Sequence, residues 1–191
     1  ASLELIGAQR QQVMDLEWPS SAVSPCIGPS IKMTGLSEGG NTLKIQISQS
    51  EIIWLEYRSD SGFDKHLPGS GILVTYQDKS VGDVAQNELN RDPNQPWLSV
   101  IEADGRNDMT SGANSGEADD LFNSGQFGAE GVKIFDHDGV LIPWVATVEN
   151  NQEMFVNFTA PNCSPSMEIN LQDHGYVILP GDNFIFTATS S

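Results

Sequence analysis

Positive charge is scarce in this chain of 191 residues: 9 Lys and Arg stand against 26 Asp and Glu, which gives a formal net charge of −17. Nucleic-acid binding needs clustered basic side chains that neutralise phosphates, so the composition excludes DNA or RNA as an unassisted partner. No apolar run approaches the ~18 residues of a membrane-spanning helix, so no membrane span is expected. A strongly acidic chain instead favours divalent cations as partners.

The motifs of several hydrolase classes are also missing. The three histidines, His66, His137 and His174, are far apart in the sequence and no HExxH occurs, so zinc is not expected in this chain. Neither a Gly-x-Ser-x-Gly motif nor a phosphate-binding loop with lysine is present. We therefore expect the chain to catalyse nothing on its own.

Cysteine is rare, and both copies lie in loops rich in Ser and Pro: Cys26 in SPCIGP and Cys163 in NCSPS. Sparse cysteines of this kind indicate one disulfide in a secreted or cell-surface protein. Two free thiols in a cytosolic protein are the alternative. On the chain-entropy model, closing so long a loop stabilises the fold by roughly 4–5 kcal/mol.

Turn-forming residues are abundant, with 18 Gly and 10 Pro spread along the chain and only 18% charged residues. This composition predicts short strands separated by polar turns. The expected fold is therefore mainly β, with antiparallel, sandwich-like sheets, one N-terminal helix and one long acidic, Gly-rich loop. The length fits a single β-rich domain over 1–191 with a core that needs no metal or disulfide to form.

Hydrophobic periodicity locates the individual elements. Leu3, Ile6 and Val13 recur at helical spacing and predict a helix over 1–18, which Pro19 and the prolines that follow would end. Apolar residues at period two, or in short continuous runs, predict strands. The expected strands are 43–47, 52–58 as a central strand, 72–76, 97–101, 154–158 and 184–186.

The stretch 102–139 differs from the rest because it is rich in acidic residues and Gly and poor in apolar residues. A loop this long is uncommon unless it is functional or disordered. Disorder is the alternative, but the stretch contains apolar side chains able to anchor it: Leu121, Phe122, Phe127, Val132, Ile134 and Phe135. We expect an ordered loop held by cations.

Three local groups of carboxylates in this loop offer the oxygen ligands that calcium prefers. They are Glu102, Asp104 and Asp108; Glu117, Asp119 and Asp120; and Asp136 with Asp138. The last group is not an EF-hand, because Leu141 and Thr147 stand where such a loop needs Gly and Glu. Calcium is the expected cofactor, and solvated turn carboxylates are the alternative for each group.

The four tryptophans, Trp18, Trp54, Trp97 and Trp144, allow two interpretations. Some of them could form a platform on which a sugar ring stacks. More often such residues belong to the core.

The run IIWLEYRSDSGFDKHLPGSGILVTYQD, at 52–78, is similar to the pattern YYLLEYR…GFDxxLPGxGLLIYHVD, which is found in secreted metallopeptidases of the immune-inhibitor-A type. The blocks WLSVIEADGRND and NSGEADDLFNSGQFG follow in the family order, and GAQRQQVMDLEW resembles the helix that follows the active-site helix. Two departures stand out: Tyr76-Gln77-Asp78 replaces His-Val-Asp, and Asn123-Ser124 replaces Pro-Gly after Leu-Phe.

This resemblance implies a zinc peptidase whose catalytic HExxHxxGxxH segment lies N-terminal to the residues seen here. The chain would then be the C-terminal portion of the peptidase unit, with a family-like core over 43–160 and a C-terminal extension over 161–191. Its expected partner is a protein or peptide substrate. A free-standing module that binds an extracellular glycan or protein is the alternative hypothesis, and a stalk or surface-layer domain is the third.

Overall fold

The computed structural model describes residues 20–62, 64–83, 85–86, 88–92 and 94–163. The helix expected over 1–18 and the strand expected at 184–186 lie outside these residues, as does Trp18. Among the described residues the protein is mainly β, with ten strands and only short helices.

The first sheet, sheet A, has five strands in the order β1-β3-β4-β5-β6. These strands are β1 (Ser20–Ala22), β3 (Thr42–Gln46), β4 (Glu51–Arg58), β5 (Gly71–Asp78) and β6 (Leu98–Val100). The continuous apolar run that predicted a central strand forms β4, the middle strand of this sheet. Both faces of β4 are buried, which explains why its sequence shows no polar alternation.

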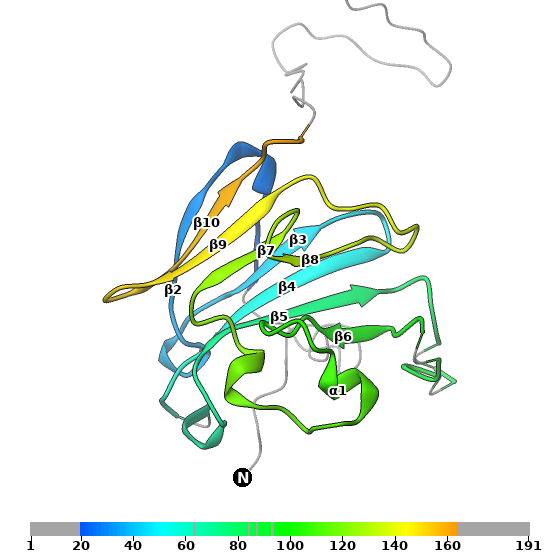
Figure 1. The fold of residues 1–191 in the computed structure, drawn as a ribbon, viewed down its shortest axis with the longest axis horizontal. Coiled ribbons are helices and arrows are strands. Elements are labelled where there is room, and N and C mark those ends of the chain that lie inside the picture. Colours follow the sequence, from blue (N-terminus) through cyan, green and yellow to red (C-terminus); the bar gives the residue numbers. More distant parts are fainter. Residues whose placement is uncertain (1–19, 63, 84, 87, 93, 164–191) are drawn as a thin grey trace, which may run out of the picture.

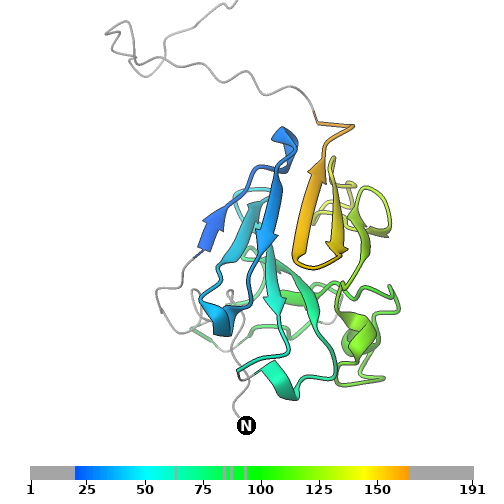
Figure 2. The same cartoon turned by 90° about the vertical axis from the view of Figure 1, so that its left-hand side faces the viewer.

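The second sheet, sheet B, also has five strands, in the order β2-β10-β9-β7-β8. These strands are β2 (Ser30–Met33), β10 (Met154–Thr159), β9 (Val145–Asn150), β7 (Gly125–Gly128) and β8 (Val132–Lys133). Figure 1 shows that the chain crosses between the sheets early, because β2 lies beside β10 while β1 and β3 lie in sheet A. Figure 2 shows the same arrangement from the side.

Five short helices connect the strands in the described part of the chain. They are the 3₁₀ helices η2 (Pro25–Ile27), η3 (Leu36–Glu38), η4 (Asp64–His66) and η5 (Ala118–Asp120), and the four-residue α-helix α1 (Asp108–Ser111). Two of them, α1 and η5, lie within the acidic stretch 102–139.

The two sheets share one hydrophobic core. Sheet A contributes Leu43, Ile45, Ile53, Leu55, Ile72 and Val74, and sheet B contributes Met33, Phe127, Ala146, Val148, Met154, Val156 and Phe158. Aromatic rings run through this core, with centroid distances of 4.9 Å for Phe122–Phe127, 6.4 Å for Phe127–Trp144 and 5.7 Å for Trp144–Phe158.

Two expectations about the fold need correction. The sheets are mixed rather than antiparallel, because β1 pairs with β3 and β7 pairs with β8 in parallel. Nor is the stretch 102–139 one continuous loop, because its second half forms β7 and β8 of sheet B. Its apolar anchors explain the difference: Phe122, Phe127 and Ile134 are almost fully buried in the common core, although Phe135 is 50% exposed.

The predicted disulfide is present between Cys26 of η2 and Cys163, which follows β10, with the two Cα atoms 5.7 Å apart. It closes a sequence separation of 137 residues and ties the start of the described chain to its end. None of the helices in the described residues has the length and apolar character needed to cross a membrane.

Candidate functional site: an acidic cluster beside α1 and η5

The acidic stretch folds back on itself next to the end of β6. Glu102 follows this strand by two residues, and the backbone N–H of Ala103 donates to the carbonyl of Asp120, 3.0 Å away. The turn before β5 packs closely against η5, because a Cβ atom on Gly69 would lie 2.9 Å from the Cα of Ala118. The first contact brings residues 102–104 and η5 together, although about fifteen residues separate them in sequence, and the second places η5 against the start of β5.

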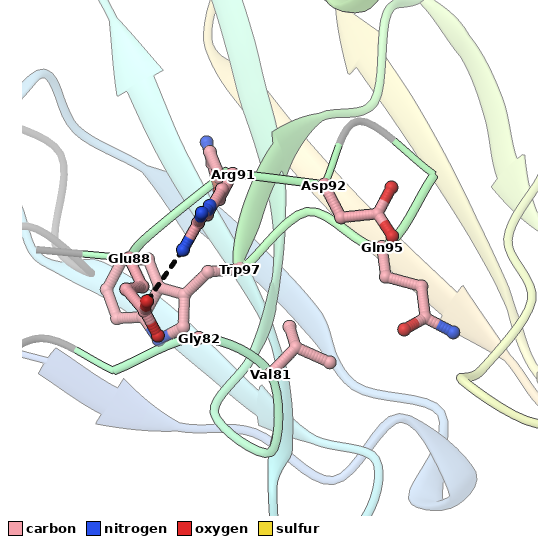
Figure 3. A pocket seen from close by; sticks show the side chains of 8 residues that line it. Val81, Gly82, Glu88, Arg91, Asp92, Gln95 and Trp97 are labelled. Atoms are coloured by element: carbon pink, nitrogen blue, oxygen red, sulfur yellow. Dashed lines mark hydrogen bonds and ion pairs between the residues drawn. The ribbon is translucent and has the colours of Figure 1, made fainter. Parts of the chain in front are cut away.

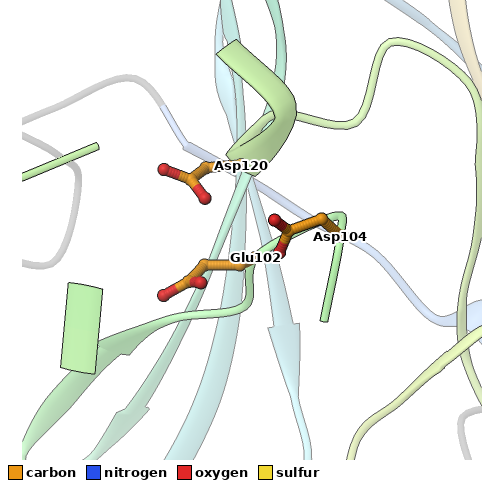
Figure 4. A group of neighbouring side chains, drawn as sticks. All are labelled: Glu102, Asp104 and Asp120. Carbon is orange, nitrogen blue, oxygen red and sulfur yellow. The ribbon is translucent and has the colours of Figure 1, made fainter. Parts of the chain in front are cut away.

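Three carboxylates meet at this point: Glu102, Asp104 and Asp120 (Figure 4). Each offers a carboxylate oxygen, and the three oxygens all lie within 4.8 Å of one another. Glu102 is 1% exposed and Asp120 is 3% exposed, while the side chain of Asp104 is 16% exposed at the rim. Burying negative charges side by side is costly without a compensating cation or hydrogen bonds.

Hydrogen bonds satisfy most, but not all, of these oxygens. Glu102 accepts the backbone N–H groups of Asp108 (2.7 Å) and Met109 (2.9 Å), which begin α1. Asp120 Oδ2 accepts the backbone N–H of Glu117 at 2.5 Å as part of a capping box at η5. Asp120 Oδ1, however, is buried and has no hydrogen-bond partner. An acceptor left in this state is what a bound cation would satisfy.

One cation, Arg106, reaches this cluster from the exposed side. Its Nη2 lies 2.7 Å from Asp119 Oδ2 and 3.7 Å from Glu117 Oε2, and its Nε lies 3.6 Å from Asp108 Oδ2. Its backbone N–H and its Nε both donate to Asp104. These hydrogen bonds, the backbone one first, hold the pKa of Asp104 below its ordinary value, and the hydrogen bond to Asp104 raises the pKa of Arg106.

Two of the predicted ligands, Asp136 and Asp138, lie elsewhere. They belong to the connection between β8 and β9, where Asp136 Oδ1 accepts the backbone N–H of Val140 in a turn. Between them, His137 contacts sheet A: its Nδ1 lies 2.8 Å from Asp78 Oδ2, and its backbone N–H donates to Glu51 Oε1 at 2.6 Å. The contacts of His137 connect the β8–β9 connection to sheet A. Asp136 and Asp138 are not part of the cluster of Glu102, Asp104 and Asp120.

Glu51 carries a charge held by hydrogen bonds rather than by a cation. Burial raises the pKa of its carboxyl, but hydrogen bonds from Ser48, Tyr76 and the backbone of His137 outweigh burial, so its pKa lies below the ordinary value. Burial and the hydrogen bond to Glu51 together raise the pKa of the Tyr76 phenol. Tyr76 therefore remains a neutral donor.

A second group of charges, Glu56, Arg58 and Asp64, lies inside the protein. Arg58 Nη2 is 2.6 Å from Glu56 Oε2, and Arg58 Nη1 is 3.3 Å from Asp64 Oδ1. The side chains are 4% exposed for Arg58, 1% for Glu56 and 0% for Asp64. This buried ion network joins β4 to η4.

The tryptophans in the described residues are core residues, with exposures of 0% for Trp54, 4% for Trp97 and 4% for Trp144. None of the three offers an open ring face on which a sugar could stack. Trp97 does line a pocket of about 570 Å³ together with polar side chains (Figure 3). The pocket is lined by Val81, Gly82, Glu88, Asn90, Arg91, Asp92, Gln95 and Trp97.

Part of the pocket's polar lining is already engaged. The side chain of Asn90 pairs with the backbone N–H and carbonyl of Leu98, and Arg91 Nη1 lies 2.7 Å from Glu88 Oε1. The pocket is thus polar, and several of the side chains that line it already form hydrogen bonds or ion pairs within the protein.

Of the eight predicted metal ligands, the structure brings Glu102, Asp104 and Asp120 together and places Asp108, Glu117 and Asp119 around Arg106. The sequence reasoning did not consider Arg106, Arg58 or the contact of His137 with Asp78. The sequence could have singled out Arg106, because it is the only basic residue between Glu102 and Val132.

Comparison of the chain with protein-family models, with curated proteins and with solved structures finds no match. The likeness to immune-inhibitor-A peptidases therefore remains a prediction from the sequence blocks alone.

Proposed function

We propose that this chain is a calcium-stabilised, non-catalytic C-terminal part of a secreted metallopeptidase-like protein, where it acts as a scaffold or contributes to substrate binding. The observation that carries the calcium site is the cluster of Glu102, Asp104 and Asp120, with its buried and unpartnered Asp120 Oδ1. The peptidase context rests on the sequence blocks at 52–78, 97–108 and 114–128.

The size of the cluster suits calcium. The three oxygens lie within 4.8 Å of one another, and calcium, which binds oxygen at 2.3–2.6 Å, can bridge ligands at such separations. Backbone carbonyls and water would complete the six to eight ligands that calcium takes.

A scaffold role agrees with the rest of the molecule. Two sheets that enclose one core form a sandwich-like body, and the disulfide suits an extracellular setting. In that setting a calcium ion would hold the stretch 102–120 against β5 and β6. Little conformational entropy would be lost on binding, because the ligands already lie close together. No zinc role is proposed for this chain, whose sequence lacks HExxH.

Thermal unfolding in chelator, followed by addition of calcium and then of magnesium, tests the calcium half of the proposal. Calcium at a hundredfold excess over Kd adds about 2.7 kcal/mol to the free energy of unfolding, which for a chain of this size raises Tm by about 5–10 °C. Asp120→Asn should lose this rise and Asp138→Asn, a matched carboxylate outside the cluster, should keep it. An unchanged Tm on calcium addition would refute the calcium site.

The peptidase half has its own test in the parent reading frame. An HExxH segment N-terminal to the blocks described above is expected there, and its absence would leave a calcium-stabilised module without a peptidase.

The polar pocket beside Trp97 favours a second function, binding of an extracellular glycan or protein. Its carboxylate, guanidinium and amide groups are those that bind sugar hydroxyls or a polar peptide. A glycan array and a pull-down with wild type and Asp92→Asn test it. Ligand capture that the variant loses would support this function, and no capture would remove it.

A further inference from the structure

Arg106 binds one of the proposed calcium ligands, so a calcium ion at this site would compete with it. Its guanidinium lies among the carboxylates of Asp104, Asp108, Glu117 and Asp119, and it is 51% exposed. Two of its groups, the backbone N–H and Nε, donate to the two oxygens of Asp104. Asp104 is one of the three carboxylates of the proposed calcium site.

The three carboxylates are therefore not equally available to a metal ion. Asp120 has one buried oxygen with no partner, and Glu102 accepts only backbone N–H groups, which leaves lone pairs on both of its oxygens. Asp104 is paired with a full positive charge. A divalent ion that binds Asp104 must share it with, or displace, the guanidinium, and it meets electrostatic repulsion from Arg106 in either case.

We propose that Arg106 is a tethered competitor of calcium, which neutralises Asp104 when calcium is absent and weakens calcium binding when it is present. This inference rests on the proposed calcium site. A competing charge of this kind suits a site that works at the calcium concentrations outside cells, where modules bind with Kd values of about 10⁻⁴–10⁻³ M. Arg106 thus sets the affinity of the site without being one of its ligands.

The proposal predicts effects of opposite sign for one substitution. In Arg106→Gln the acidic stretch loses its counter-charge, so Tm in chelator falls by about 1–2 °C. Calcium, however, binds about tenfold more tightly, because a positive charge that repels the divalent ion has been removed. A purely structural role for Arg106 would weaken both properties together.

Isothermal titration of the full chain with calcium chloride, at low and at high salt, provides the measurement. Lys133→Gln, which removes an exposed positive charge from β8, is the matched control and should keep the wild-type Kd. Arg106→Lys keeps the charge and should stay within about threefold of wild type. High salt should shrink the difference between wild type and Arg106→Gln, because the guanidinium of Arg106 is half exposed and its interactions are screened.

The outcomes separate this inference from the calcium site itself. If neither wild type nor Arg106→Gln binds calcium, the proposed site is wrong and this inference falls with it. If wild type binds and Arg106→Gln binds equally or more weakly, the site stands and the competitor role is overturned. Tighter binding by Arg106→Gln but not by Lys133→Gln supports the competitor role.

Discussion

Two charge clusters of similar size in the described part of the protein are balanced differently. In the cluster of Glu56, Arg58 and Asp64, the guanidinium lies between two carboxylates and all three side chains are buried, which leaves a formal charge of −1. In the cluster of Glu102, Asp104 and Asp120, all three members are carboxylates, with a formal charge of −3.

Both clusters contain a buried carboxylate oxygen without a partner, Asp64 Oδ2 in one and Asp120 Oδ1 in the other. An unpaired oxygen alone therefore does not mark a cation site. What distinguishes the second cluster is that its nearest cation, Arg106, lies at the exposed rim and binds only one of the three carboxylates. One cluster thus has its cation built into the fold, whereas the other has Arg106 only at its rim.

Removing the internal cation should cause the greatest loss of stability. Arg58→Met removes the guanidinium that pairs with the buried carboxylates of Glu56 and Asp64, which is expected to lower the free energy of unfolding by about 3–5 kcal/mol. Urea unfolding measures this loss, and calcium should not restore it. A loss below about 1 kcal/mol, or restoration of stability by calcium, would contradict the view that Arg58 is the cation that balances this cluster.

The next effect concerns the cluster without an internal cation. Asp120→Asn keeps an oxygen that can accept the N–H of Glu117 but removes a buried negative charge. In chelator the free energy of unfolding should change by less than about 1 kcal/mol, whereas the gain of about 2.7 kcal/mol with calcium at a hundredfold excess over Kd should vanish. Urea titrations with and without calcium measure both the free energy of unfolding in chelator and the gain on calcium addition. If the variant retains the calcium-dependent gain in stability, calcium binds at other residues and the proposed site is wrong.

Glu51 provides a third case, a carboxylate balanced by hydrogen bonds alone. Because its pKa is lower in the folded protein, its stabilisation is present above the unfolded pKa of about 4.3 and is lost as the pH falls below that value. Glu51→Gln should therefore be less stable than wild type by about 1 kcal/mol at pH 7 and equally stable near pH 3. Urea unfolding between these pH values tests it, and a constant difference would contradict the titration of Glu51.

An exposed ion pair should matter least. Lys32 and Glu153 form a salt bridge between β2 and the turn before β10, with side chains 52% and 51% exposed. Lys32→Gln should change the free energy of unfolding by about 0.5 kcal/mol or less and leave calcium binding unchanged. Thermal unfolding with and without calcium provides the comparison, and a loss similar to that of Arg58→Met would mean that burial does not set these energies.

Local patterns predicted the strands that carry strong hydrophobic signals. The alternation at 43–47 and 154–158 and the apolar run at 52–58 correspond to β3, β10 and β4. β9 was missed because Val145 and Ala146 are adjacent and both buried, which breaks the period of two. β7, with glycine at both ends, and the two-residue β8 owe their place to pairing across sheet B rather than to their own propensity.

The candidate site was only partly predictable for a related reason. All three of its carboxylates were among the predicted ligands, but they come from two different sequence groups. The hydrogen bond from Ala103 to Asp120 joins those groups, and this contact does not follow from local spacing. The disulfide was predictable because the chain contains only two cysteines, which left a single possible pairing.

The most direct measurement is an anomalous difference map from crystals grown with calcium and recorded at long wavelength. The proposed site predicts a peak 2.3–2.6 Å from oxygens of Glu102, Asp104 and Asp120, with the guanidinium of Arg106 turned away from Asp104. A map without a peak among these carboxylates, or with a peak only at Asp136 and Asp138, would contradict it.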